Sequence, residues 1–187
     1  SIFTQTSNTN ISCFGGNNGS IIISILNGGM PPYNFSNNNG VNYQASNTFN
    51  NLVSGNYSFL ISDNNGCLGS ALTELIEPLA ITSSTSATDV SCYGYCDGSV
   101  SVTALGGTTP YDHNWPNGTS NLCAGLYNVI TTDVNGCINS NSVVVNEPNP
   151  LIINVSIVGN TIVATSGFTS YQWYDNYNNQ IIGATDS

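Results

Sequence analysis

The sequence predicts an all-β protein made of tandem small immunoglobulin-like β-sandwich modules stapled by disulfide bonds. The apolar residues are mainly Ile, Val, Tyr and Phe, which favour pleated strands. Nineteen glycines and many asparagines favour turns, because both residue types tolerate left-handed backbone conformations. Six cysteines, an even number, are typical of disulfide-stapled domains in an oxidising compartment outside the cytoplasm.

The charge composition excludes several classes of function. The 187 residues contain no Lys or Arg and ten Asp or Glu, so the formal net charge is −10. Without cationic side chains the chain cannot neutralise phosphates, and we expect no nucleic-acid partner. It also lacks a polybasic patch for a membrane surface and any apolar run long enough to cross a bilayer, so we expect no direct membrane insertion.

Two segments match each other in a fixed order and define an internal repeat with a period of about 70 to 79 residues. The matching motifs of the first copy are Cys13-Phe14-Gly15, Gly28-Gly29, Pro32-Tyr33, Asp63-Asn64-Asn65-Gly66-Cys67 and Glu77-Pro78. Their counterparts are Cys92-Tyr93-Gly94, Gly106-Gly107, Pro110-Tyr111, Asp133-Val134-Asn135-Gly136-Cys137 and Glu147-Pro148. The repeat predicts a first module at residues 1–78 and a second at 79–148. Residues 149–187 are expected to form a partial immunoglobulin-like module that continues beyond the chain or is completed by a partner.

Each module is expected to consist of short strands separated by tight turns. An opening strand is expected around Ile2–Thr6, and the other strands expected in the first two modules are Ser20–Leu26, Tyr57–Ser62, Leu68–Ile76, Ser99–Leu105, Tyr127–Thr132 and Ile138–Val145. Asn-Gly pairs at 18–19, 27–28, 39–40, 65–66, 117–118 and 135–136 predict hairpin corners. In the third segment the expected strands are Leu151–Ile157, Thr161–Ala164 and Ser170–Tyr174, with Trp173 in mid-strand as in immunoglobulin-like domains.

The repeat also suggests how four of the cysteines pair. If every disulfide stays within one module, Cys13 must pair with Cys67, because the first module has no other cysteine. The aligned pair in the second module is Cys92 with Cys137. Closing loops of this length would contribute roughly 4 kcal/mol in the chain-entropy model, which is comparable to the net stability of a small module.

The remaining two cysteines are both specific to the second module. Cys96 aligns with Asn17 and Cys123 aligns with Val53, so both are missing from the first module together. Two cysteines that are both present in one module and both missing from the other are expected to be bonded to each other, so we expect a Cys96–Cys123 disulfide. The alternative is a zinc site built from all four cysteines of the second module, although such sites usually show closer cysteine pairs.

Aromatic residues that alternate along one expected strand are candidates for ligand contact. Tyr111, His113 and Trp115 share one face of this strand, and the only histidine aligns with Phe35 of the first module. We interpret His113 first as a half-buried packing ring, with an exposed aromatic face that stacks on sugars as the alternative. A catalytic or metal-binding role for a single histidine is disfavoured.

Two aspartates occupy equivalent turns. Asp63 and Asp133 each precede an x-Asn-Gly-Cys sequence, which predicts an Asx-capped hairpin turn. The alternative is a weak calcium site at a module junction, with Glu77 or Glu147 as an additional ligand. An EF-hand loop would need several more oxygen ligands, and these are missing. We expect no other metal and no cofactor.

No arrangement of residues predicts an enzyme. No serine nucleophile has a plausible base, because the only histidine is the packing candidate. Glycosidase chemistry needs two facing carboxylates, whereas the acidic residues here lie mostly in turns. We therefore expect a non-enzymatic protein.

The order of short motifs resembles the SprB repeat, named for a gliding-motility adhesin of certain Gram-negative bacteria. The motifs are Cys-x-Gly followed by Asp/Asn-Gly-Ser, Gly-Gly followed by Pro-Tyr, Trp-x-Asn-Gly, Leu-x-Ala-Gly-x-Tyr and Asp-x-Asn-Gly-Cys, over about residues 5–148. The first module departs from this pattern, since Asn37 replaces the typical Trp and the second cysteine pair is absent. The tail, with Tyr171-Gln172-Trp173-Tyr174, resembles the immunoglobulin-like modules of the same secreted proteins.

The resemblance implies a bacterial cell-surface protein, exported by the type IX secretion route, in which tandem repeats serve as a stalk and adhesive array for gliding motility or attachment. The implied partners are other modules of the same long chain, neighbouring copies or surface polysaccharide. One alternative is a structural subunit of an extracellular fibre assembled by strand addition. The other is a carbohydrate-binding accessory module of a secreted enzyme, which would present the aromatic face described above.

Overall fold

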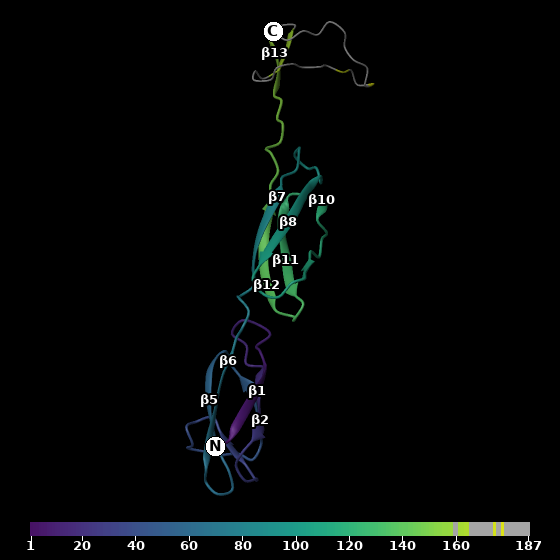
Figure 1. Cartoon of the computed structure of the whole chain (residues 1–187). Coiled ribbons are helices and arrows are strands. Elements are labelled where there is room, and N and C mark those ends of the chain that lie inside the picture. The colour runs from purple at the N-terminus through teal and green to yellow at the C-terminus, as the bar shows by residue number, and fades with distance from the viewer. Residues whose placement is uncertain (159–160, 165–173, 175–176, 178–187) are drawn as a thin grey trace. The chain divides into compact units, whose positions relative to one another are not determined.

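The protein is described by a computed structural model that covers residues 1–158, 161–164, 174 and 177. It divides into two compact units, Ser1–Pro148 and Asn149–Ser187. The described residues form β-strands and turns and no helix, and every pair of neighbouring strands is antiparallel, so the predicted all-β class is confirmed (Figure 1).

The first module consists of two three-stranded sheets. One sheet has the order β1-β2-β4 and contains β1 (Phe3–Thr9), β2 (Gly19–Asn27) and β4 (Thr48–Leu52). The other has the order β3-β5-β6 and contains β3 (Asn34–Ser36), β5 (Gly55–Ser62) and β6 (Leu68–Leu75). Ile21 and Ile23 of β2 and Phe59 and Ile61 of β5 are fully buried between the sheets. Because side chains alternate along a strand, the intervening residues face outward, as expected for a small sandwich.

The second module repeats this topology. Its sheets have the orders β10-β8-β7 and β12-β11-β9. The strands are β7 (Thr82–Thr88), β8 (Gly98–Leu105), β9 (Tyr111–Asn114), β10 (Ser120–Leu122), β11 (Gly125–Asp133) and β12 (Ile138–Val145). Its buried hydrophobic cluster is smaller and consists of Val90, Val100, Leu122 and Val145, with Trp115 and Tyr127 packed against it. Its cluster of four buried residues, against ten in the first module, gives the second module less hydrophobic stabilisation.

Of the six Asn-Gly pairs predicted to be hairpin corners, those at 65–66 and 135–136 do connect paired strands, β5 with β6 and β11 with β12. Those at 27–28, 39–40 and 117–118 form turns between strands of different sheets, so the hairpin prediction is wrong there. Gly28, Gly40, Gly66, Gly118 and Gly136 all have a positive φ, between 77° and 82°. The pair at 18–19 is different, because Gly19 begins β2 and is buried. A Cβ at Gly19 would lie 2.8 Å from Leu75 Cδ1 and 2.9 Å from the Leu52 carbonyl oxygen, so this position requires glycine for close packing rather than for a turn.

The second unit contains one described hairpin, β13 (Val155–Val158) paired with β14 (Thr161–Ala164). The first of these begins later than the expected Leu151–Ile157, and the second matches the prediction. The expected strand Ser170–Tyr174 and its Trp173 lie outside the described residues, apart from Tyr174. The module boundaries at 78 and 148 stay a prediction, although each described sheet takes its strands from one predicted module only.

Candidate functional site

The loop between β1 and β2 places Cys13 at the end of the first module where the chain leaves it. The Ile11 amide donates to the carbonyl oxygen of Ile76 at 3.1 Å. The Gly15 amide donates to Glu77 Oε2 at 2.5 Å, so the carboxylate holds the loop against the segment that follows β6. The corresponding Glu147 accepts from the Gly94 amide at 3.0 Å in the second module, and the repeated Glu-Pro motif is therefore a loop cap that we did not predict.

The turn between β11 and β12 places Cys137 at the end of the second module where the chain enters it. Asp133 Oδ1 accepts hydrogen bonds from the Asn135 and Cys137 amides, both at 2.9 Å. Asp133 Oδ2 accepts from the Thr108 amide at 2.8 Å, which connects this turn to the Gly-Gly turn after β8. The carboxylate thus fixes the backbone on both sides of the cysteine.

A disulfide between Cys13 and Cys137 joins the two modules covalently. Their Cα atoms are 5.6 Å apart, within the usual range for a disulfide. Next to the bridge, Asn135 Nδ2 donates to the Ser12 carbonyl oxygen at 3.3 Å. The two modules therefore meet through one covalent bond and at least one polar contact.

A hollow of about 340 Å³ lies beside this disulfide. Its walls come from both modules and from the connecting segment, and they include Phe14, Leu79, Ile81, Gly107 and Ile138. The connecting segment is held in place because the Gly107 amide donates to the Leu79 carbonyl oxygen at 2.7 Å. We refer to the disulfide and this hollow together as the joint.

The predicted pairings Cys13–Cys67 and Cys92–Cys137 are wrong. Cys13 precedes the Gly19 end of β2, whereas the turn with Cys67 lies against Met30, beyond the other end of that strand. A strand of nine residues spans roughly 30 Å, and disulfide Cα atoms lie within about 7 Å of each other. Within a module the two cysteines are therefore too far apart, and Cys67 and Cys92 are free and exposed.

The predicted Cys96–Cys123 pairing agrees with the structure. This disulfide ties the loop that precedes β8 to the turn that follows β10. The zinc alternative does not fit, because Cys96, Cys123 and Cys137 are all in disulfides. Among the described residues, no group of three or more His, Cys, Asp or Glu side chains is arranged to hold a metal ion.

The alternating aromatic residues face the interior of the second module. Tyr111, His113 and Trp115 are all half-buried. The Tyr111 hydroxyl donates to the Gly106 carbonyl oxygen, and His113 Nδ1 lies 3.0 Å from Thr131 Oγ1. Trp115 packs against the buried cluster. This geometry supports packing rings rather than a flat platform for sugars, and binding of sugars here stays a prediction.

The aspartates that were candidate calcium ligands are capping groups. Asp63 and Asp133 are 6% and 5% exposed, and each carboxylate accepts three backbone N–H groups. Desolvation raises the pKa of Asp63, but hydrogen bonds from the backbone of Cys67, Met30 and Asn65 outweigh it and hold that pKa below the usual value. The pKa of Asp133 is lowered in the same way. Donors already occupy these oxygens, which favours the Asx-turn interpretation, and weak calcium binding stays a prediction.

Two all-β modules of one topology, joined through a disulfide, define a disulfide-stapled tandem-repeat protein. The family model of the SprB repeat matches residues 6–42 and 84–120, so the chain contains two tandem SprB repeats. No curated protein matches the chain. The SprB repeat is a non-catalytic repeat of surface proteins, which indicates a protein of the surface-adhesin type, and the family implies gliding motility and type IX secretion. The described part of the chain has no helix that could cross a membrane.

Proposed function

We propose that the chain is a non-enzymatic part of a large secreted bacterial cell-surface adhesin. In this proposal its tandem repeats serve both as a stalk and as an array of weak contacts with a surface. The partners are other modules of the same long chain, neighbouring copies and surface polysaccharide. Gliding motility or surface attachment is the process in which such an array would act.

The joint is the observation that carries this proposal. A disulfide between repeats adds nothing to the interior of either sandwich, because both cysteines lie in end loops. The peptide chain already connects the repeats, and the effect of the disulfide is to prevent the segment between Cys13 and Cys137 from extending when a repeat opens. Such a link is useful in a stalk that is pulled from both ends, which agrees with a mechanical rather than a catalytic role.

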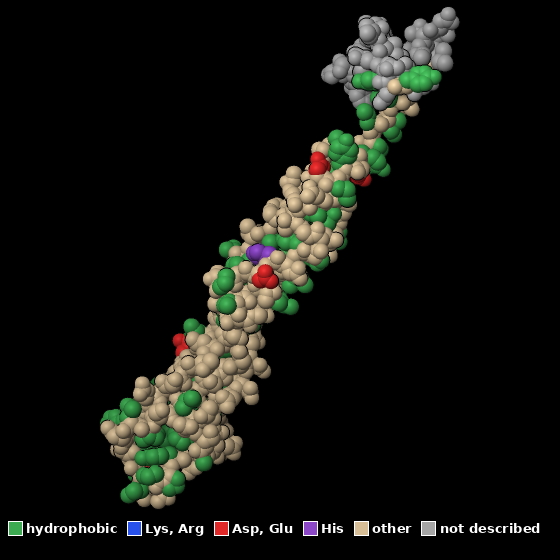
Figure 2. Space-filling view, turned by 90° about the vertical axis from the view of Figure 1, so that its right-hand side faces the viewer, with side chains coloured by type: hydrophobic (Ala, Val, Ile, Leu, Met, Phe, Trp, Pro, Cys, Tyr) green, Lys and Arg blue, Asp and Glu red, His purple; other side chains and the backbone are tan. Residues whose placement is uncertain are grey.

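The surface chemistry agrees with many weak contacts. The face shown in Figure 2 is covered mostly by neutral polar side chains and backbone, with scattered hydrophobic groups and few acids. Because the chain has no Lys or Arg, its contacts cannot rely on ion pairs with acidic groups. Many weak neutral contacts become strong attachment only when several modules act together through a high effective concentration.

Attachment of coated beads under flow tests the adhesive role. Beads carrying the chain at increasing density would be passed over bare glass and over polysaccharide-coated glass. We expect attachment to rise more steeply than in proportion to density, because each additional contact is intramolecular once the first has formed. Beads coated with a neutral all-β protein without SprB repeats are the control.

If attachment equals that of the control beads at every density, the adhesive part of the proposal is wrong and the repeats act only as a spacer. Attachment that grows in simple proportion to density would contradict the array mechanism. A variant with Cys13→Ser and Cys137→Ser is the matched control for the joint, because it keeps both modules and the peptide segment between them and removes only the disulfide.

A further inference from the structure

We propose that the free thiols of Cys67 and Cys92 are the two halves of a second joint, so that SprB repeats of this kind link head to tail through disulfides. The partner of Cys92 is a Cys67-type turn of another SprB repeat pair, and the partner of Cys67 is a Cys92-type loop. A second copy of this chain supplies both. This inference does not depend on which surface the protein contacts.

The turn that carries Cys67 is the counterpart of the bonded turn that carries Cys137. Asp63 Oδ1 accepts from the Asn65 amide at 2.9 Å and from the Cys67 amide at 2.8 Å, and Asp63 Oδ2 accepts from the Met30 amide at 3.0 Å. The same three bonds hold the turn of Cys137, with Asp133 as the acceptor. The structure thus contains the same turn twice, once with its cysteine in a disulfide (Cys137) and once with its cysteine free (Cys67).

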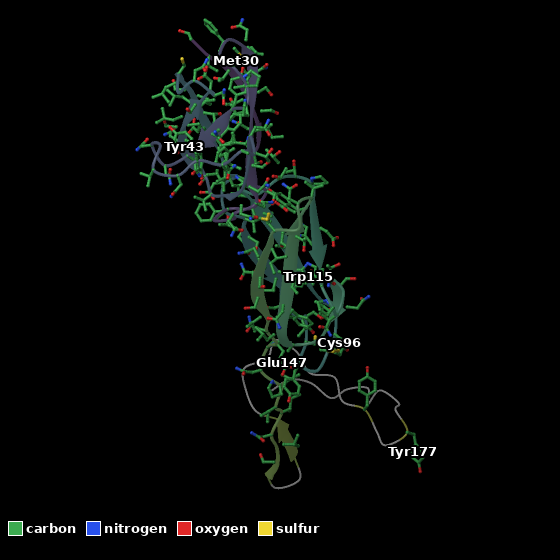
Figure 3. All side chains as sticks on the ribbon, turned by 90° about the horizontal axis from the view of Figure 1, so that it is seen from below. Met30, Tyr43, Cys96, Trp115, Glu147 and Tyr177 are labelled. Carbon is green, nitrogen blue, oxygen red and sulfur yellow. A yellow bond between two sulfur atoms is a disulfide. The ribbon has the colours of Figure 1, made fainter. Side chains whose placement is uncertain are left out.

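The loop that carries Cys92 is likewise the counterpart of the bonded loop that carries Cys13. The Ser91 amide donates to Asp97 Oδ1 at 2.9 Å, as the Ser12 amide donates to Asn18 Oδ1 at 3.1 Å. The Gly94 amide is capped by Glu147, just as the corresponding amide of the first loop is capped by Glu77. In Figure 3, Glu147 and Cys96 lie at the same end of the second module, which is the end of this loop.

The apolar surroundings of the joint are also repeated at the two free ends. Phe14 and Ile138 line the hollow beside the Cys13–Cys137 disulfide. Their counterparts are Tyr93 beside Cys92 and Leu68 beside Cys67. All four side chains are more than half exposed, so the free ends and the joint present the same apolar neighbours in the same way. Each free end therefore presents its thiol beside the same type of apolar side chain as the corresponding side of the joint. Contact between two such ends is heterologous and generates an open chain rather than a closed dimer.

The bond forms by thiol–disulfide exchange with a small disulfide or a thiol–disulfide oxidoreductase. One cysteine loses its proton to solvent, and its thiolate attacks the disulfide of the oxidant to give a mixed disulfide and one released thiolate. The cysteine of the second copy loses its proton and attacks the mixed disulfide, which forms the Cys67–Cys92 bond and releases the second thiolate. Two electrons pass from the two cysteines to the oxidant.

Mixing two single-cysteine variants tests this pairing. Cys67→Ser leaves Cys92 as the only free thiol, and Cys92→Ser leaves Cys67. The two proteins, with different mass tags, would be mixed in a buffer of reduced and oxidised glutathione, in which unfavourable pairs reverse. We expect the heterodimer to exceed each homodimer by about tenfold, because only that pair reproduces the contacts of the joint and so raises the effective concentration of the two thiols.

Random oxidation would make the heterodimer half of all dimers, and that result would overturn the proposal. Absence of any dimer at equilibrium would overturn it as well. The wild-type chain should form a ladder of oligomers, and blocking its free thiols by alkylation should abolish the ladder without a change in the melting temperature. Peptide mapping of the heterodimer should show Cys92 joined to Cys67, while Cys13–Cys137 and Cys96–Cys123 stay intact.

Discussion

At one equivalent position the two modules differ in their cross-strand pair, which is apolar in the first module and hydrogen-bonded in the second. In the first module Phe35 of β3 lies opposite Ile61 of β5, and both side chains are buried. In the second module the same pair is His113 of β9 and Thr131 of β11, which contact each other through Nδ1 and Oγ1. An apolar contact has been replaced by a hydrogen bond, which adds a directional constraint to the smaller core.

Exchanging this pair for that of the first module tests the idea. His113→Phe alone leaves the fully buried Thr131 hydroxyl without its partner, and Thr131→Ile alone leaves the imidazole without its partner. We expect each single change to lower the free energy of unfolding by about 1–3 kcal/mol. The double variant restores an apolar pair that one module already accommodates, so it should be more stable than either single variant. Chemical denaturation of all four proteins measures the coupling.

If the loss of unfolding free energy in the double variant equals the sum of the losses in the two single variants, this account is wrong. The comparable double change in the first module, Phe35→His with Ile61→Thr, is a matched control for the pair in the opposite direction. The sequence predicted that His113 is a packing ring, but it did not predict Thr131 as its partner. That partnership depends on the register between β9 and β11, which are not consecutive strands in the chain.

At the scale of the element, the hairpin turns are organised by a buried carboxylate. The folded pKa of Asp63 and Asp133 lies below the usual value, because backbone N–H donors favour the ionised form. A group with a lowered folded pKa contributes stability that is fully present above its unfolded pKa. This contribution is lost as the pH falls through the folded pKa.

We expect the wild-type melting temperature to fall below about pH 4 as these carboxylates become protonated. Asp133→Asn keeps the side-chain shape but loses the negative charge. It should therefore melt a few degrees lower at pH 7 and show less loss between pH 5 and pH 2.5. Asp112→Asn, at an exposed position on β9, is the control and should follow the wild type. Parallel pH profiles for Asp133→Asn and the wild type would show that the carboxylate does not stabilise the turn.

Elements with strong local signals were predictable, and elements that depend on their neighbours were not. The Asn-Gly turns were predictable because a left-handed residue is needed whatever surrounds it. Strand β7, with the sequence Thr-Ser-Ser-Thr-Ser-Ala-Thr, has almost no apolar residues and was not predicted. Its hydroxyl groups are satisfied by other strands: Ser84 and Ser86 pair with hydroxyls of β8, and Thr85 donates to a carbonyl of β12. Those partners are visible only in the folded protein.

For the whole molecule, the all-β class and the internal repeat were predictable, and the route of the disulfides was predictable only in part. Cys96 and Cys123 could be paired because the first module lacks both. Cys13 was assigned to the wrong partner because we assumed that bridges stay within modules. Strand directions in the sandwich place its nearest neighbour in the next repeat, and the sequence of a single repeat does not contain that information.

Pulling the chain from its two ends tests the role of the joint. The disulfide closes a loop with a sequence separation of 124, and this part of the chain cannot extend while the bond is intact. Unfolding both modules after full reduction should therefore release about 400 Å more contour length than in the oxidised protein. In Cys13→Ser/Cys137→Ser the gain should be about 90 Å smaller, because the Cys96–Cys123 disulfide still closes its loop of sequence separation 27. Single-molecule force spectroscopy measures this difference directly. Equal contour lengths in the two states would show that the joint is not formed in solution.

The Cys13–Cys137 bond also changes which parts of the protein carry a load. Tension applied at Ser1 passes along β1, crosses the two sulfur atoms and continues along β12 to Pro148. The other strands of both modules lie within the loop that the disulfide closes, so the covalent path that carries the tension does not pass through them. These strands can unfold and refold without increasing the distance between Ser1 and Pro148. Over this part of the chain the protein therefore acts as a tether of nearly fixed length, and the force that breaks it does not depend on whether the modules are folded.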